Sequence, residues 1–221
     1  SQSGIITNTR HNRARIIEVR PYRLMDELDA GKVVIVAGYQ GVSYAREITT
    51  LGRGGTDTTA VALAAALEAE YCEICSDVDG VYTADPRVVP SAEKLSALTH
   101  DEMVALARSG ARVLNQDCVA YASQAGVAIF TKATFGPRDD KGTVIRTNPC
   151  EGQRTVTAIT HRERIARVIS DAAISTERLI EISASLGALP CAVRGGGASG
   201  RTEMWFALED VHRMDALVTR L

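Results

Sequence analysis

Residues 49–87 decide the fold, because two polar segments flank an Ala/Leu-rich run and a short strand-like run. The first segment reads Thr49-Thr50-Leu51-Gly52-Arg53-Gly54-Gly55-Thr56-Asp57-Thr58-Thr59, and the second reads Ser76-Asp77-Val78-Asp79-Gly80-Val81-Tyr82-Thr83-Ala84-Asp85-Pro86-Arg87. This order predicts a glycine-rich turn, a buried helix, a strand and a polar loop. Glycines that gather backbone N–H groups ahead of a helix are typical of anion binding. We therefore predict a phosphate-handling site.

The middle of this stretch predicts one helix and one strand. Residues 58–70 are apolar around most of a helical circumference, which is typical of a buried helix. Thr56 or Asp57 is expected to cap its first turn. Residues 71–76 follow as the next strand, so the polar loop begins where that strand ends.

The N-terminal part predicts short elements that lead into the glycine-rich turn. We expect strands over residues 4–7 and 15–18 and a helix over residues 23–30. Residues 33–37 form a continuous β-branched run, which predicts a strand buried on both faces. Residues 38–41 then form a turn at the carboxyl end of that strand, where open α/β sheets bind ligands.

Alternating helices and strands continue through residue 150. Thr99 and Glu102 have the spacing of a capping box, which predicts a helix start at that point. A second helix is expected over residues 114–124 and a strand over residues 127–131. The alternation indicates an α/β domain over residues 1–150.

The sequence pattern changes near residues 148–152, where we place a linker. Residues 151–221 form a second predicted domain. Its expected elements are a strand (155–159, extending as far as 169), a helix (176–186), a strand (189–193), a glycine-rich turn (195–200), a strand (203–208) and a helix (211–221). This βαββα order fits a small ferredoxin-like unit that lacks its last strand.

Composition excludes several classes of function. A net charge of -2 gives no field that would attract nucleic acid or an anionic membrane surface. No apolar run reaches the roughly 20 residues that span a bilayer. Five cysteines without a disulfide spacing favour a reducing, cytoplasmic location. Cys72 and Cys75 lie three apart in a predicted strand and so face opposite sides, which disfavours a metal or redox site.

Several polar residues have both structural and functional interpretations. Arg53 lies among glycines, where its guanidinium is placed to bind a carboxylate or phosphate at two points. Asp77 and Asp79 would point to one side of an extended backbone, although a turn at Gly80 also explains them. The four histidines are dispersed, and no G-x-x-x-x-G-K-[ST] element is present, which disfavours a zinc site, a Ser-His-Asp triad and a P-loop NTPase.

Taken together, T-T-L-G-R-G-G-T-D-T-T-A at 49–60 and D-V-D-G-V-Y-T-A-D-P-R at 77–87 resemble the aspartate kinases of the amino acid kinase family. The resemblance covers residues 1–150, and the tail is similar to that family's ACT regulatory region. It implies a three-layer αβα sheet followed by an α+β ACT unit. It also implies transfer of the γ-phosphoryl group of Mg-ATP to the side-chain carboxylate of L-aspartate, in the biosynthesis of lysine, threonine and methionine.

The resemblance also implies roles for individual residues. Aspartate would be held by Arg53, Gly54, Gly55 and Thr56. The catalytic residues would be Asp57 and Arg112, with Asp57 orienting cations around the transferring phosphate. ATP would be contacted by Ser76, Asp77, Tyr82 and Arg87. No protein metal site is implied, and Mg²⁺ would arrive with ATP.

Three features depart from the family pattern. Thr56 stands where many relatives have Ser, and Arg112 stands where they have Lys. The family's Lys-x-Gly-Gly segment and a substrate-binding Glu would both lie upstream of Ser1, and a second ACT unit would lie beyond Leu221. We therefore expect an internal segment of a longer protein, inactive or severely impaired in isolation.

Two other functions remain open from sequence. One is a non-catalytic regulatory subunit or amino-acid-binding ACT module, and the other is a related kinase for glutamate or uridylate. By analogy with the family, lysine or threonine is the expected effector at the ACT region. A homo-oligomer formed through ACT domains is expected on the same basis.

Overall fold

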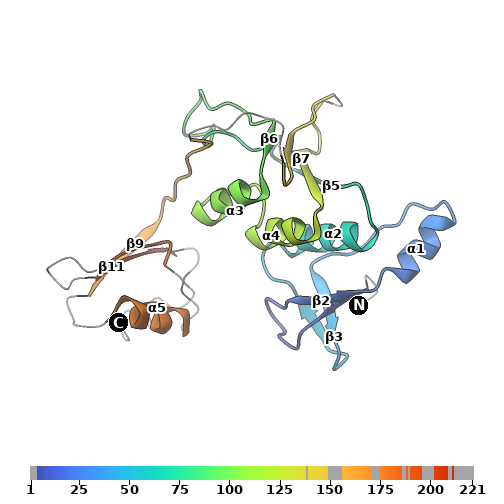
Figure 1. Ribbon diagram of the computed structural model, residues 1–221, viewed down its shortest axis with the longest axis horizontal. Helices are drawn as coiled ribbons and strands as arrows, with labels where there is room; N and C mark the ends of the chain where they lie inside the picture. The colour runs from blue at the N-terminus through green and yellow to red at the C-terminus, as the bar shows by residue number, and fades with distance from the viewer. Residues whose placement is uncertain are drawn as a thin grey trace. The chain divides into compact units, whose positions relative to one another are not determined.

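The computed structural model describes most of the chain, and Figure 1 shows its elements. The described residues are 4–137, 139–148, 156–170, 175–185, 188, 190–195, 202–208 and 211. The chain divides into two compact units, Ser1–Thr160 and His161–Leu221. The linker predicted near residues 148–152 lies largely outside the described residues.

The first unit begins with a four-stranded sheet in the order β2-β1-β3-β4. Its strands are β1 (Ile5–Thr7), β2 (Ile16–Val19), β3 (Gln40–Ser43) and β4 (Ile48–Thr50). β1 pairs antiparallel with β2 and parallel with β3, and β3 and β4 form an antiparallel hairpin. The two predicted N-terminal strands are confirmed, whereas the hairpin was not predicted.

Residues 33–37 do not form the predicted strand buried on both faces. The structure assigns no strand there, and Val33 and Ile35 are 95% and 96% exposed. Val34 and Val36 pack against the apolar cluster that contains Leu63. The run therefore buries alternate residues only in part, and no described strand pairs with it.

A second four-stranded sheet has the order β5-β7-β8-β6. Its strands are β5 (Tyr71–Ser76), β6 (Ala97–Leu98), β7 (Ala128–Ala133) and β8 (Thr143–Ile145). β5 and β7 run parallel, so their carboxyl ends meet with Ser76 opposite Ala133. The predictions for β5 and β7 are confirmed, and the α/β class is correct. The short strands β6 and β8 were not predicted.

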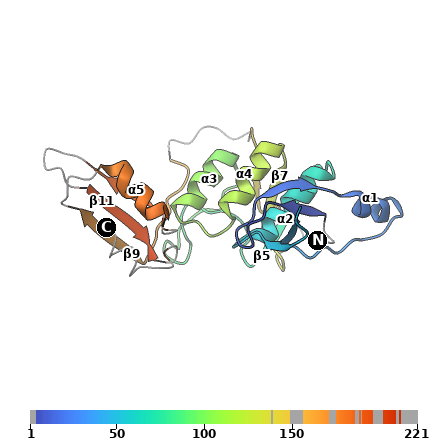
Figure 2. The same ribbon diagram turned by 90° about the horizontal axis from the view of Figure 1, so that it is seen from below.

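Three helices pack together in this unit, as Figures 1 and 2 show. They are α2 (Gly55–Ala66), α3 (His100–Ser109) and α4 (Gln116–Ala125). Val61 and Ala64 of α2 belong to the main core, while Ala62 and Leu63 belong to a second cluster around Ile5. α2 is thus buried on two sides, which explains its apolar sequence.

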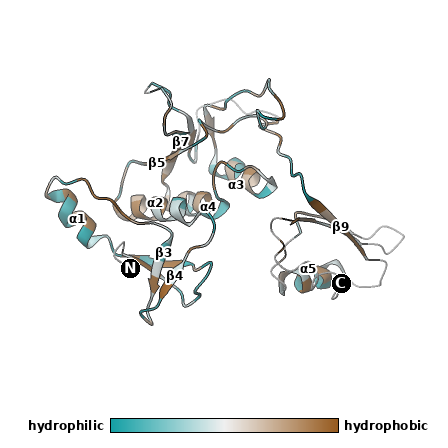
Figure 3. Ribbon diagram, turned by 180° about the vertical axis from the view of Figure 1, so that it is seen from behind, coloured by the Kyte–Doolittle hydropathy of each residue, from teal (hydrophilic) through white to brown (hydrophobic). Residues whose placement is uncertain are grey.

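Helix α1 (Tyr22–Asp29) confirms the helix predicted over residues 23–30. It buries only Leu24, and Figure 3 colours it mostly hydrophilic, in contrast to α2. The capping box at α3 is also confirmed: the Thr99 hydroxyl accepts from the Glu102 N–H at 3.0 Å, and the Glu102 carboxylate accepts from the Thr99 N–H at 2.8 Å.

The four cysteines among the described residues fall into a buried and an exposed class. Cys72 and Cys118 are buried, whereas Cys75 and Cys191 are exposed. The prediction that Cys72 and Cys75 face opposite sides is therefore correct. Burial raises the pKa of the Cys72 thiol to about 11 and also raises the pKa of Cys118.

The second unit contains a three-stranded antiparallel sheet and one described helix. Its elements are β9 (Ile165–Ser170), α5 (Thr176–Ser185), β10 (Ala192–Arg194) and β11 (Thr202–Ala207), with sheet order β10-β11-β9. Leu179 of α5 packs on Met204 and Phe206 of β11 in a separate core. The expected βαββ order is present. The predicted helix over residues 211–221 lies outside the described residues except for Val211.

Residues 156–160 differ from the predicted strand over residues 155–159. They form no strand, and they pack with the first unit. The Ile159 N–H donates to the Thr83 carbonyl at 2.8 Å, and the Thr157 hydroxyl donates to Glu102 at 2.7 Å. The strand begins only at Ile165.

Candidate functional site

The glycine-rich turn forms the start of α2. Gly54 is the N-cap residue, with φ +72° in the left-handed region, and no side chain caps the helix. The prediction that Thr56 or Asp57 caps this turn is therefore wrong. Helix α2 begins at Gly55, three residues earlier than predicted, so Thr56 and Asp57 lie inside its first turn. Backbone N–H groups at such a start carry partial positive charge.

A neighbouring turn lies against this helix start. The Tyr39 N–H donates to the Thr59 hydroxyl at 3.1 Å, and the Leu51 N–H donates to the Tyr39 carbonyl at 2.9 Å. The predicted ligand-binding turn at residues 38–41 thus contacts both ends of the glycine-rich segment. This contact forms although residues 33–37 are not a paired strand.

Asn115 holds the same turn from α4. Its Oδ1 accepts from the Asp117 N–H at 2.8 Å and so caps α4. Its Nδ2 donates to the Arg53 carbonyl at 3.0 Å. A Cβ on Gly54 would lie 2.4 Å from the Asn115 Cβ, so the turn and the side chain are in close contact. One amide therefore connects the N-termini of two helices.

The charges around this turn suit an anion at Arg53. The Arg53 side chain is exposed, and within the described part of the chain its guanidinium has no carboxylate partner. Thr56 is also exposed, whereas Asp57 is half-buried, and burial raises the pKa of its carboxyl. The turn thus combines an available cation, a hydroxyl and a helix N-terminus.

Arg112 lies in the loop between α3 and α4. It is exposed and stands three residues before Asn115, the residue that contacts the glycine-rich turn. The backbone therefore brings the loop of Arg112 toward Arg53 and Gly54. Arg112 thus lies in the loop that leads into the N-cap of α4, where Asn115 contacts the predicted aspartate turn.

The second polar segment begins at the carboxyl end of β5. The Ser76 hydroxyl accepts from the Val78 N–H at 3.2 Å and closes a turn. The Ser76 carbonyl accepts from both the backbone N–H and the hydroxyl of Thr134, at 2.8 and 3.0 Å. Asp77 is exposed at this turn. The loop after β5 is therefore fixed to the loop after β7.

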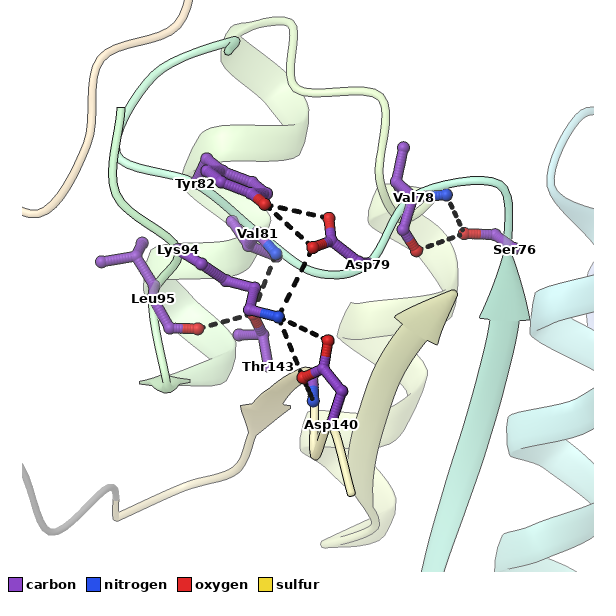
Figure 4. Close-up of polar contacts among 10 residues, drawn as sticks. Ser76, Val78, Asp79, Val81, Tyr82, Lys94, Leu95, Asp140 and Thr143 are labelled. Atoms are coloured by element: carbon purple, nitrogen blue, oxygen red, sulfur yellow. Dashed lines mark hydrogen bonds and ion pairs between the residues drawn. The ribbon is translucent and has the colours of Figure 1, made fainter. Parts of the chain in front are cut away.

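Asp79 and Tyr82 belong to a network that Figure 4 shows in close-up. The Tyr82 hydroxyl donates to both carboxylate oxygens of Asp79, at 2.9 and 3.1 Å. Lys94 Nζ lies 3.4 Å from Asp79 and 2.7 Å from Asp140. Of the two interpretations of Asp77 and Asp79, the structure agrees with a turn, because the backbone bends after Ser76. The Asp79 carboxylate is bound within this network.

Arg87, at the end of the loop, pairs locally. Its guanidinium donates to both carboxylate oxygens of Asp85, at 3.0 and 2.7 Å. The Asp85 side chain also accepts from the Arg87 N–H at 2.9 Å. Asp85 thus orients Arg87, and the Arg87 side chain remains 81% exposed.

Residues 1–131 match the sequence profile of the amino acid kinase family. The chain belongs to the amino acid kinase family. Its two polar loops therefore lie in a domain that phosphoryl-transfer enzymes share.

Curated relatives narrow the comparison within the amino acid kinase family. An aspartokinase of Mycolicibacterium smegmatis is 51% identical over 147 residues, which are 66% of this chain and 34% of that protein. An aspartokinase of Corynebacterium glutamicum is 43% identical over 203 residues, 82% of this chain and 48% of that protein. The chain thus spans between a third and a half of the relatives it matches.

Solved structures of aspartokinase III from E. coli share the fold. The complex with lysine and aspartate has a TM-score of 0.79 and 26% identity, covering 99% of this chain and 51% of that one. The complex with aspartate and ADP has a TM-score of 0.77 and 26% identity, covering 93% and 47%. The likeness extends over both units of this chain.

Three residues that contact the two polar loops were not predicted from the sequence: Asn115, Lys94 and Asp140. Asn115 precedes a predicted helix, which signals a cap but not the second bond to Arg53. Lys94 and Asp140 are 46 positions apart, and no local pattern connects them.

The described residues give no sign of two other kinds of site. They contain no group of three or more metal-ligating His, Cys, Asp or Glu side chains. None of their helices is long and apolar enough to cross a membrane.

Proposed function

We propose that the natural protein carrying this chain is an aspartate kinase, which transfers the γ-phosphoryl group of ATP to the side-chain carboxylate of L-aspartate. The observation that carries the proposal is Arg53, an exposed guanidinium without a described carboxylate partner, beside the N-terminus of α2. Its relatives named aspartokinase, and the E. coli structures with bound aspartate and ADP, support this assignment.

Arg53 is the residue we assign to the α-carboxylate of aspartate. A guanidinium binds a carboxylate through two parallel hydrogen bonds, which fixes orientation as well as position. Backbone N–H groups of Gly54, Gly55 and Thr56 lie at the start of α2 and add partial positive charge. Asn115 holds this turn through the Arg53 carbonyl, so the guanidinium projects from a fixed backbone.

In the proposed reaction a side-chain carboxylate oxygen of aspartate attacks the γ-phosphorus. The bond from that phosphorus to the bridging oxygen breaks, ADP leaves, and 4-phospho-L-aspartate forms. The nucleophile is already deprotonated at neutral pH, so no general base is required. Such transfer depends on positioning and charge neutralisation, for which we assign Asp57 and Arg112.

ATP is assigned to the loop after β5, through Ser76, Asp77, Tyr82 and Arg87. The turn at Ser76 and the pair Asp85–Arg87 give this loop a fixed form with an exposed carboxylate and an exposed cation. Mg²⁺ in such sites binds through phosphates and one or two carboxylates. Asp77 is the exposed carboxylate that fits this requirement.

We assign the second unit to regulation as an ACT domain. Its β9-α5-β10-β11 order and antiparallel sheet support the assignment, as does the likeness to an aspartokinase solved with lysine. Lysine or threonine is the effector class we propose, together with assembly of copies through this unit. A cytoplasmic place in amino-acid biosynthesis follows from the same proposal.

The direct test traps the acyl phosphate with hydroxylamine. The full-length natural protein with Mg-ATP should form the hydroxamate and ADP with L-aspartate, and neither with L-glutamate or UMP. Arg53→Met should raise the KM for aspartate by about 100-fold, as expected when a charge-assisted pair is lost. Hydroxamate formation with glutamate instead of aspartate would overturn the substrate assignment. The 221-residue chain, tested beside it, is expected to be inactive or severely impaired.

A further inference from the structure

Lys94 lies across the candidate nucleotide loop, opposite Tyr82. The two residues form an isolated antiparallel bridge, and the Leu95 N–H donates to the Val81 carbonyl at 2.8 Å beside it. Because the backbones are paired here, the side chains of Tyr82 and Lys94 belong to one local arrangement. Figure 4 shows both directed toward Asp79.

The ammonium group of Lys94 lies between two carboxylates. It donates to the Asp140 oxygens at 2.9 and 2.7 Å and to Asp79 at 3.4 Å. The Lys94 side chain is 29% exposed, and an ammonium has three donors. The Lys94 ammonium therefore already donates to two carboxylates, which makes it a poor ligand for a phosphate.

The chain of contacts continues from Lys94 through Asp79 to Tyr82. Asp79 accepts from both the Lys94 ammonium and the Tyr82 hydroxyl. Burial, and then the hydrogen bond to Asp79, raise the pKa of Tyr82, so the phenol stays protonated and keeps donating. The hydrogen bond to Asp140 raises the pKa of Lys94. The hydrogen bonds of Asp79 with Lys94 and Tyr82 are thus the same across the neutral pH range.

Two residues anchor the other side of this network: Asp140 in the loop before β8, and Thr143, the first residue of β8. Asp140 accepts from the Gly142 N–H at 2.9 Å, which fixes its carboxylate. The Thr143 hydroxyl accepts from the Val81 N–H at 2.9 Å and donates to the Leu95 carbonyl at 2.6 Å. Residues about 60 positions apart in the sequence therefore fix both the side chain and the backbone of the Tyr82 segment.

We propose that Lys94 and Asp140 are positioning residues for the nucleotide, acting through Asp79 to hold Tyr82 in its binding orientation. This inference rests on the assignment of the loop after β5 to ATP. It assigns to Lys94 a role that its charge alone does not suggest, since a lysine near a nucleotide is ordinarily read as a phosphate ligand.

Lys94→Met and Asp140→Asn, made in the full-length natural protein, test the inference. Both should raise the Kd for ADP and the KM for ATP by about tenfold, or ~1.4 kcal/mol. The KM for aspartate should change by less than about twofold, because the aspartate turn has its own anchor in Asn115. Lys132→Met is the matched control, since it removes a similar ion pair, to Glu73 at 2.9 Å.

A double-mutant cycle separates this role from general support of the fold. In a Tyr82→Phe background, Lys94→Met should have a clearly smaller effect on ADP binding, because the hydrogen bond between Tyr82 and Asp79 is already absent. A loss of thermal stability with unchanged ADP affinity would overturn the inference, as would full additivity with Tyr82→Phe. If Lys94→Met does not fold, Asp140→Asn and Tyr82→Phe give the same comparison.

Two outcomes distinguish this inference from the proposed function. A protein that binds ADP with the expected dependence on Lys94, yet forms no acyl phosphate, retains the inference and overturns the kinase assignment. A protein that phosphorylates aspartate but binds ADP equally well in all variants retains the kinase and overturns the inference. A protein that binds no nucleotide overturns both.

Discussion

At the scale of single residues, Asn115 has two separable tasks that a pair of substitutions distinguishes. Asn115→Asp retains an oxygen for the Asp117 N–H but loses the donor to the Arg53 carbonyl. Under the proposed function it should raise the KM for aspartate by about tenfold, the effect of one lost hydrogen bond plus a new repulsion. The measurement is steady-state kinetics with each substrate varied in turn.

Asn115→Ala provides the comparison because it removes the cap of α4 as well. It should cost about 1 kcal/mol of unfolding free energy, the usual value of an N-cap, which Asn115→Asp should retain. Equal KM values for aspartate in wild type and Asn115→Asp would show that the turn does not depend on this amide.

Gly54 gives a second prediction at this scale. It has φ +72°, and an added Cβ would lie 2.4 Å from the Asn115 Cβ. Gly54→Ala should destabilise the first unit in urea by about 2 kcal/mol or more, from the left-handed backbone and the clash together. Gly126→Ala is the matched control, since φ is +70° there and no atom lies within 4 Å. Equal losses in the two variants would show that Asn115 adds no constraint.

At the scale of elements, the exposed face of residues 33–37 has a consequence for solubility. Val33 and Ile35 are exposed, apolar and β-branched. Within the described residues the backbone of 33–38 makes no hydrogen bond, so this extended segment resembles the unpaired edge of a sheet. Unpaired edges of this kind promote association between chains. Ile35→Lys should reduce the concentration-dependent light scattering of the 221-residue chain and change its stability by less than about 0.5 kcal/mol.

Val36→Lys is the comparison for this edge, because Val36 packs against the cluster that contains Leu63. It should destabilise the chain by about 2 kcal/mol or more, since it places a charge against that cluster. Scattering that is the same in Ile35→Lys and in the unmodified chain would show that association occurs through another surface.

Elements with strong local signals were predictable from the sequence. The capping box sets the start of α3, and the apolar run with its flanking loops gave β5 with its observed bounds. The strand predicted over residues 33–37 is absent. A β-branched run indicates only a preference for extended backbone, whereas a strand also needs a neighbouring strand to pair with. The hairpin β3-β4 was missed because its strands have four and three residues, one of them containing a glycine.

For the candidate site, the positions of the two polar loops were predictable, because each follows or precedes a recognisable element. The contacts that fix them were not. Asn115 meets Arg53 across 62 positions and Lys94 meets Asp140 across 46, and such pairings depend on how the helices and strands pack. The predicted cap at Thr56 or Asp57 failed for a related reason, since Gly54 itself starts the helix.

At the scale of the whole molecule, acid stability depends partly on Glu18. Hydrogen bonds from Arg20, and then from Tyr44, lower its pKa from the usual range to about 2. A lowered pKa contributes stability above the unfolded value, and this contribution is lost as pH falls from about 4.3 toward 2. Glu18→Gln should therefore have a flatter decline of Tm over this interval and an unchanged slope above pH 5.

A carboxyl NMR titration gives an independent check on Glu18. Tyr44→Phe removes one of the two donors and should move the Glu18 pKa part of the way back toward 4.3. A titration midpoint near 4.3 in the unmodified protein would contradict the role of both donors.

The cysteine side chains allow opening of the folded structure to be followed by chemical labelling. Desolvation raises the pKa of Cys72, Cys118 and Cys75, but Cys72 and Cys118 lie in the core, whereas Cys75 is exposed three residues along the same strand as Cys72. A maleimide should therefore modify Cys75 before Cys72, because Cys75 is accessible in the folded protein and Cys72 becomes accessible only when the strand leaves the core. The delay between the two adducts, followed by mass spectrometry, measures how often the sheet that contains β5 opens.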